Sequence, residues 1–83
     1  MKRNNIDICA DILRVSKGGA KKTHLVYQAN LNFKIVKKYI TELIEKELLE
    51  MTGDRFYVTE KGSEFIERYE ILVSPLADRL FLE

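Results

Sequence analysis

Residues suited to covalent or metal-centred chemistry are scarce in this chain. Its 83 residues include one cysteine, Cys9, and one histidine, His24. A lone cysteine cannot form an internal disulfide, and neither residue has a partner at the spacing of a metal site or of a Cys-His nucleophile pair. We expect Cys9 to be a reduced core thiol and His24 to lie on the surface. The sequence predicts no metal site, no cofactor and no enzymatic activity.

Hydrophobic runs long enough to cross a bilayer, roughly 20 residues, are also missing. The initial segment MKRNNIDI has basic residues but no apolar stretch behind it, so we expect a cytoplasmic protein. With 83 residues, 46% of them hydrophobic, the chain has apolar material for one compact domain. A core this small makes dimerisation or tight helix packing a reasonable expectation.

Acidic charge is sparse in the first half of the chain and abundant in the second. Residues 1–41 carry nine Lys or Arg against two Asp, a balance of +7. Residues 42–83 carry five basic residues against eleven acidic ones, a balance of −6. Unless both are ordinary solvated faces, this asymmetry indicates that one face meets a polyanion.

Apolar residues at three- and four-residue steps predict three helices in the first half. Asn5 is the expected cap of the first, which ends at Gly18-Gly19. Thr23 is the expected cap of a short second helix over residues 24–29, which a tight turn follows. Asn32 is expected to cap the third and longest helix. The apolar stripe of that helix consists of Phe33, Val36, Ile40, Leu43 and Ile44.

Beyond residue 48 the pattern changes from helix to strand. Residues 49–52 and 55–58 are β-prone and flank Gly53-Asp54, which suits a type II′ turn, so we expect a two-stranded hairpin. Thr59 is the expected cap of a fourth helix, whose start Gly62 weakens slightly. Pro75 is expected to interrupt this helix or to restart it.

The order helix, short helix, tight turn, longer helix, hairpin, helix is that of a winged helix-turn-helix domain. The segments AKKTHLVYQANLNFKIVKKYITELIEKELLE and GDRFYVTEKG resemble small archaeal winged-helix regulators and chromatin-associated proteins. The resemblance implies an α+β, mostly helical fold with a three-helix bundle, a two-stranded wing and a C-terminal helix. It also implies a homodimer that binds double-stranded DNA, as a transcriptional regulator or a nucleoid-associated protein, with the third helix in the major groove.

Basic and polar residues are available for that role. The third helix carries a basic face opposite its apolar stripe, while Asn32 can contact a base edge or cap the helix, with capping favoured. Positive charge and free amides before the second helix suit a phosphate oxygen. Lysine lacks the bidentate fork of arginine, so we expect modest specificity. The predicted DNA-binding residues are Lys21, Lys22, Thr23, Asn32, Lys34, Lys37, Lys38, Thr41 and, beside the wing tip, Arg55.

Two positions depart from the pattern of these relatives. Glu47 stands where they usually have the glycine of EKGLL, so it must adopt a positive φ or end the helix differently. The C-terminal helix is short and contains Pro75, where long-tailed relatives have an extended coiled coil. The geometry of their dimer is therefore not transferred to this chain.

Apolar spacing in the C-terminal segment, residues 60–83, predicts a dimerisation element that follows a winged-helix domain of residues 1–70. The alternative is that this apolar stripe packs only on its own domain. The predicted dimerisation residues are Ile66, Tyr69, Val73, Leu76 and Leu80.

Other functional classes have weaker support. The stretch SKGGAKKT lacks the GxxxxGK[ST] spacing of a nucleotide-binding loop, and no small-molecule ligand is evident. The aromatic residues occupy core-like positions and form no stacking platform for single strands. The main alternative is a winged-helix protein-interaction module within a larger transcription assembly, without direct DNA reading. The placement of the lysines favours DNA.

Overall fold

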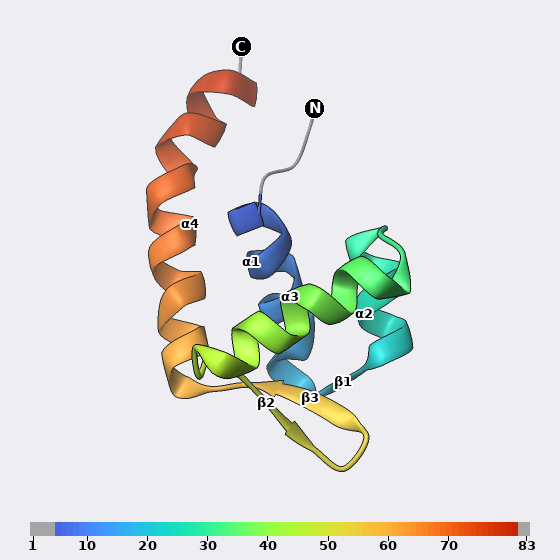
Figure 1. Ribbon diagram of the computed structural model, residues 1–83. Helices are drawn as coiled ribbons and strands as arrows, with labels where there is room; N and C mark the ends of the chain where they lie inside the picture. Colours follow the sequence, from blue (N-terminus) through green and yellow to red (C-terminus); the bar gives the residue numbers. More distant parts are fainter. Residues whose placement is uncertain (1–4, 82–83) are drawn as a thin grey trace.

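The computed structural model describes the backbone of residues 5–81 and the side chains of residues 5–73. Four α-helices surround a small core, and a hairpin projects from one end of the molecule (Figure 1). The elements are α1 (Asn5–Val15), a 3-10 turn (Ser16–Gly18), β1 (Ala20–Lys21), α2 (Lys22–Ala29), α3 (Phe33–Glu45), β2 (Leu49–Thr52), β3 (Arg55–Val58) and α4 (Glu60–Phe81).

The hairpin has the bounds expected from its residues, but its sheet has a third strand. The antiparallel order is β1-β3-β2, so β3 is central, and Lys21 pairs with Arg55 across the β1–β3 ladder. The expectation of a two-stranded wing was therefore incomplete, because a two-residue strand has no periodicity to detect. Gly53 has a φ of 64°, as the first central position of a type II′ turn requires.

The core lies where α1, α2, α3 and α4 meet the sheet. The apolar stripe of α3 is confirmed in part, because Val36, Ile40 and Leu43 are buried, whereas Phe33 and Ile44 are partly exposed. The core residues contributed by the other elements are Ile8, Ile12, Leu13, Ala20, Leu25, Ala29, Leu48, Leu49, Phe56 and Ile66.

The helix starts differ from the expected caps in two of four cases, those of Thr23 and Asn5. Asn32 caps α3 as expected, because its side chain accepts a hydrogen bond from the Ile35 amide at 2.9 Å. Thr23 is not the cap of α2, because the helix already begins at Lys22 and has no side-chain cap. Asn5 is the first residue of α1, and its Oδ1 accepts a hydrogen bond from the Tyr39 hydroxyl at 2.7 Å.

A compact junction joins the end of α3 to the start of α4. Glu47 has a φ of 63°, so this glutamate takes the left-handed conformation, the first of the two outcomes expected for it. The carbonyl of Glu47 accepts a hydrogen bond from Thr59 Oγ1 at 2.7 Å. Thr59 Oγ1 in turn caps α4, because it accepts a hydrogen bond from the Gly62 amide at 3.0 Å. A Cβ on Gly62 would lie 2.2 Å from the Leu48 carbonyl oxygen. Gly62 is thus required by close packing and is more than a weak helix position.

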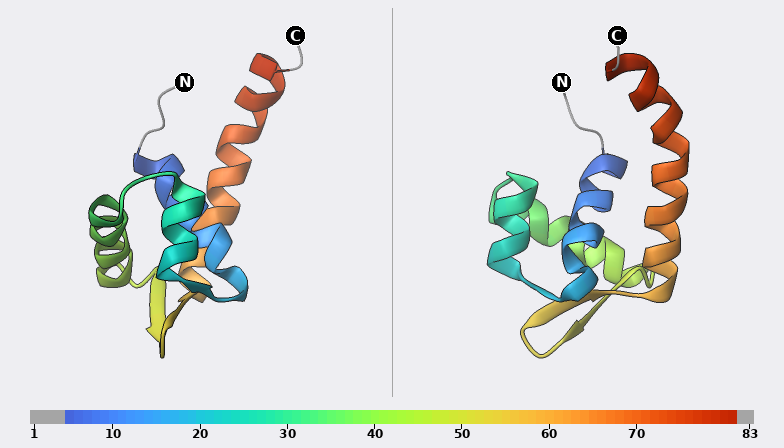
Figure 2. Two further views of the ribbon diagram at one scale, coloured as in Figure 1. Left: turned by 90° about the vertical axis from the view of Figure 1, so that its right-hand side faces the viewer. Right: turned by 180° about the vertical axis from the view of Figure 1, so that it is seen from behind.

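α4 is a single helix from Glu60 to Phe81, so the expected interruption at Pro75 is wrong. A proline inside a helix removes one hydrogen bond and crowds the carbonyl four residues earlier, which can bend a long helix without ending it. The views in Figures 1 and 2 show α4 running beyond the start of α1. Among the described residues, no helix is long and apolar enough to span a membrane.

Candidate nucleic-acid interface

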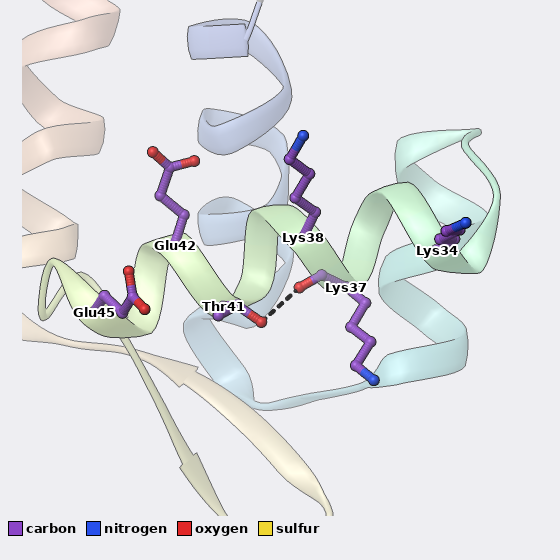
Figure 3. A pocket seen from close by; sticks show the side chains of 6 residues that line it. All are labelled: Lys34, Lys37, Lys38, Thr41, Glu42 and Glu45. Atoms are coloured by element: carbon purple, nitrogen blue, oxygen red, sulfur yellow. Dashed lines mark hydrogen bonds between the residues drawn. The ribbon is translucent and has the colours of Figure 1, made fainter.

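The exposed side of α3 carries the residues predicted to meet DNA. Lys34, Lys37, Lys38 and Thr41 are all exposed, and Figure 3 shows them along the helix face away from the core. An open hollow of about 610 Å³ beside this face is lined only by side chains of α3. Within the part of the chain that the structure describes, no other element lines the hollow, so this side of α3 is accessible.

Two polar groups of this face already have partners within the chain. The Asn32 side chain caps the helix, which confirms capping as its role, and Thr41 Oγ1 donates a hydrogen bond to the Lys37 carbonyl at 2.9 Å. By contrast, the three lysines make no ion pair with any residue that the structure describes. The positive charge of α3 is therefore available, whereas its uncharged polar groups are largely committed to the helix.

The charge on α3 changes sign along its length. Lys34, Lys37 and Lys38 occupy its first half, while Glu42 and Glu45 line the other end of the same hollow (Figure 3). Glu42 is 4.0 Å from Lys46, an exposed pair that neutralises little of the acidic end. An approaching polyanion is thus attracted to the start of the helix and repelled from its end.

The start of α2 lies next to the start of α3 through an interaction that sequence reasoning missed. The Lys22 ammonium lies 4.7 Å from the centroid of the Phe33 ring, and this ring is 49% exposed. A cation over an aromatic face is held electrostatically, so Lys22 is positioned beside the start of α3. The cue was Phe33 itself, because an aromatic residue at a helix start can reach the preceding helix.

β1 brings the remaining predicted cations together beside the turn of the hairpin. Lys21 and Arg55 are paired in register, and both side chains are exposed. Lys21 Nζ is also 3.7 Å from a carboxylate oxygen of Asp54 at the hairpin turn, and both partners are largely exposed. Thr23 is exposed one residue into α2. The structure therefore places eight of the nine predicted residues on α2, α3 and the β1–β3 ladder, and the ninth, Asn32, is the cap of α3.

Cys9 and His24 have surroundings that differ from each other. Burial raises the pKa of the half-buried Cys9 thiol, with a smaller contribution from the negative charge of Glu42. His24 is exposed, as expected. No cluster of three His, Cys, Asp or Glu side chains able to hold a metal ion occurs within the described part of the chain.

The predicted dimerisation stripe begins in the core of the domain and continues along α4. Ile66 is 1% exposed within its own chain and belongs to the core cluster. Tyr69 is half-buried and donates a hydrogen bond to Asp7 on α1, which raises the pKa of the Tyr69 hydroxyl. Val73 is half-buried, whereas the side chains of Leu76 and Leu80 lie outside the described residues.

Exposed apolar side chains on α4 and α2 were not anticipated. Leu72 is 72% exposed and Ile71 is 66% exposed. Neither residue belongs to the predicted dimerisation stripe. Tyr27 on α2 is 81% exposed, so its expected core-like position is wrong. On α2 it lies two residues from Leu25 and from Ala29, which are both buried, and this spacing directs it away from them.

Three helices, a short helix-to-helix turn and a hairpin beside an exposed basic helix define a winged helix domain. The chain matches the winged helix-turn-helix family over residues 2–74 and belongs to that family. Its fold is the α+β, mostly helical arrangement that the sequence predicted.

Similar proteins occur in an archaeon. The uncharacterized protein MJ0290 of Methanocaldococcus jannaschii is 35% identical over 71 residues, which cover 84% of this chain and 34% of that protein. The uncharacterized protein MJ0287 of the same organism is 33% identical over 78 residues, or 88% of this chain and 80% of that protein. The chain thus spans about a third of the length of MJ0290 and most of MJ0287.

Two solved structures share the fold. Sso10a-2, described as a DNA-binding protein from Sulfolobus solfataricus, aligns with a TM-score of 0.77 and 26% identity, covering 92% of this chain and 84% of that chain. IdeR of T. acidophilum aligns with a TM-score of 0.70 and 18% identity, covering 98% of this chain and 41% of that chain. The likeness to IdeR concerns the fold alone.

Proposed function

We propose that this protein binds double-stranded DNA through the basic face, which we define as Lys34, Lys37 and Lys38 on α3 with Lys21, Lys22 and Arg55 beside it. The single observation that carries the proposal is the group of three exposed α3 lysines with no ion-pair partner among the described residues. Such a surface neutralises phosphates and releases counterions from the duplex. The name of Sso10a-2, a DNA-binding protein of the same fold, supports this direction.

The charge change along α3 suggests how the helix meets the duplex. Lysines in its first half attract phosphates, whereas Glu42 and Glu45 are repelled by them. The helix therefore enters the major groove by its start, and its C-terminal end points away from the DNA. Thr23 and the first turn of α2 then rest near a phosphate, and Arg55 lies near the adjacent backbone or minor groove.

The proposed form is a homodimer joined through the C-terminal segment. α4 extends beyond α1, which leaves its last turns without a described neighbour in Figures 1 and 2. The apolar spacing of Val73, Leu76 and Leu80 continues along this end. Two basic faces in one dimer suit either a transcriptional regulator or a nucleoid-associated protein.

DNA binding is tested by titrating labelled duplex DNA with the wild type and with Lys37→Glu/Lys38→Glu. We expect the variant to lose most of its affinity. Lys17→Glu/Lys61→Glu, which makes the same charge change at exposed positions outside the basic face, serves as the control. Equal losses in the two variants would point to a general charge effect, and absence of binding at low salt would contradict the proposal.

Dimerisation is tested by sedimentation of the wild type and Leu76→Asp/Leu80→Asp. The variant is expected to be monomeric where the wild type is a dimer, because a buried seam does not tolerate unpaired carboxylates. Ile71→Asp/Leu72→Asp places the same two charges at exposed positions of α4 outside the stripe and should leave the dimer intact. A monomeric wild type at micromolar concentration would refute this part of the proposal.

The protein-interaction alternative makes a different prediction for the same basic face. An acidic protein surface could dock on these lysines through charge alone. If the wild type binds no duplex DNA at low salt, while an acidic polypeptide such as polyglutamate is bound and Lys37→Glu/Lys38→Glu abolishes that binding, the alternative is favoured.

A further inference from the structure

A cleft between α1, α3 and α4 is not part of the basic face. Its volume is about 200 Å³, and its apolar lining comes from Ile6, Cys9, Tyr39, Leu43, Leu48 and Phe65. Ile6 is 56% exposed at the rim, whereas Leu43 and Leu48 are buried at the base. An apolar cavity of about 150 Å³ can hold a benzene molecule. The cleft is therefore large enough for one substituted ring.

A second hollow adjoins this cleft and has a different chemical character. It measures about 240 Å³ and shares Asn5, Tyr39 and Glu42 with the cleft. Lys38 lines it as well, and the Tyr39 hydroxyl donates its hydrogen bond to Asn5 Oδ1 in the shared wall. Because that oxygen is the acceptor, the Asn5 amide nitrogen keeps its donors for another group.

The charge around the two hollows is uneven. Glu42 lines both of them and is 4.0 Å from Lys46, so an anion is favoured at the end where Lys38 borders the second hollow. Lys38 has no ion-pair partner among the described residues. An apolar base beside a free ammonium and amide donors is the arrangement that holds a small organic acid.

We propose that the cleft binds a small organic anion, whose single ring or branched chain lies between α1, α3 and α4 and whose carboxylate is held by Lys38 and Asn5. Since Lys38 also belongs to the basic face, a bound anion competes with phosphate for this side chain. This coupling rests on the proposed DNA binding, whereas the binding of the anion does not.

The direct test uses amide NMR spectra of the full chain without DNA and phenylacetate as the probe. We expect saturable shifts centred on Cys9, Tyr39 and Phe65, with an affinity in the millimolar range for a molecule of this size. Phenylacetamide and phenethylamine have the same ring with neutral and positive ends, and both should bind more weakly. No saturable shift at about 20 mM phenylacetate, or stronger binding of the amine, would overturn the proposal.

Variants separate the cleft from general surface binding. Cys9→Met fills the cleft and should abolish the shifts, whereas Cys9→Ala leaves it open and should retain them. Ile6→Asp, at an exposed rim position, repeats the loss without altering the core. Lys38→Gln should weaken binding about two- to five-fold, as for loss of an exposed ion pair. Unchanged affinity in both Cys9→Met and Ile6→Asp would overturn the site.

The coupling is measured separately, by DNA titration with and without phenylacetate. The anion should weaken DNA binding of the wild type and have little effect on Lys38→Gln. If the wild type binds no DNA, the proposed function fails, whereas the NMR titration still tests whether the cleft binds the anion. Equal effects of the anion on both proteins would refute the competition through Lys38.

Discussion

Neutralising two lysines of α3 should change the salt dependence of DNA binding by a calculable amount. Lys34, Lys37, Lys38 and Arg55 are exposed and have no ion-pair partner among the described residues, so under the proposed function we count one phosphate contact for each of these four residues. The other two residues of the basic face, Lys21 and Lys22, already contact Asp54 and Phe33 and are not counted. Each contact adds about 0.9 to the slope of log K against log salt, so the four contribute about 3.6. Affinity per protomer should then fall about 150-fold between about 50 and 200 mM salt.

The variant Lys37→Gln/Lys38→Gln retains about half of this slope. Its affinity should fall only about 12-fold per protomer over the same range, and its curve should approach that of the wild type at high salt. Fluorescence anisotropy of a labelled duplex at four or five salt concentrations measures both slopes. Lys17→Gln/Lys61→Gln is the control with equal charge. An unchanged slope in the α3 variant would refute the assignment of phosphate contacts to this helix.

Three further predictions concern stability, which thermal or urea unfolding measures. Gly62→Ala should destabilise the folded protein by about 2–3 kcal/mol, because the Cβ of the alanine meets the backbone carbonyl oxygen of Leu48. Gly18→Ala, which has open space around it, should change the stability little. Equal losses of stability in the two variants would contradict the packing argument. Glu47→Gly should stabilise by up to about 1 kcal/mol by relieving a positive φ, a gain that Glu47→Ala should lack. The hydrogen bond to Asp7 raises the pKa of the Tyr69 hydroxyl above its ordinary value of 10.0. This hydrogen bond therefore stabilises the folded state fully at pH values below 10.0, and the stabilisation is lost as the pH rises through the raised pKa. The stability difference between wild type and Tyr69→Phe should therefore narrow at alkaline pH, and a constant difference would oppose this reasoning.

Periodicity and capping were sufficient to predict the main elements. The stripe of Val36, Ile40 and Leu43 identified α3, and the Asn32 side chain marked its start. The turn residue Gly53 identified the hairpin. These features are encoded by residues that are close together in the chain, so a single sequence is sufficient to predict them.

Features that depend on tertiary contacts were missed. β1 exists because β3 offers an edge, and two residues carry no pattern of their own. The apolar helical spacing of Ile66 fits a dimer seam and a core equally well, and only the packing of α4 against the rest of the domain places Ile66 in the core. Likewise, Gly62 is needed because the Leu48 carbonyl lies close to it in space, although the two residues are distant in the sequence. For the basic face, residue types could be predicted, but the contact of Lys22 with Phe33 could not.

The pairing of β1 with β3 has a kinetic consequence. It joins Ala20 to Phe56, so the ladder closes a loop that contains α2, α3 and β2. The entropy of closing so long a loop opposes pairing until the enclosed elements have formed, and two residues contribute few hydrogen bonds in return. We expect β1 to join the sheet late in folding and to detach first. Amide hydrogen exchange should therefore be faster in β1 than in the β2–β3 ladder, so that the start of α2 is released from the hairpin while the hairpin itself remains intact.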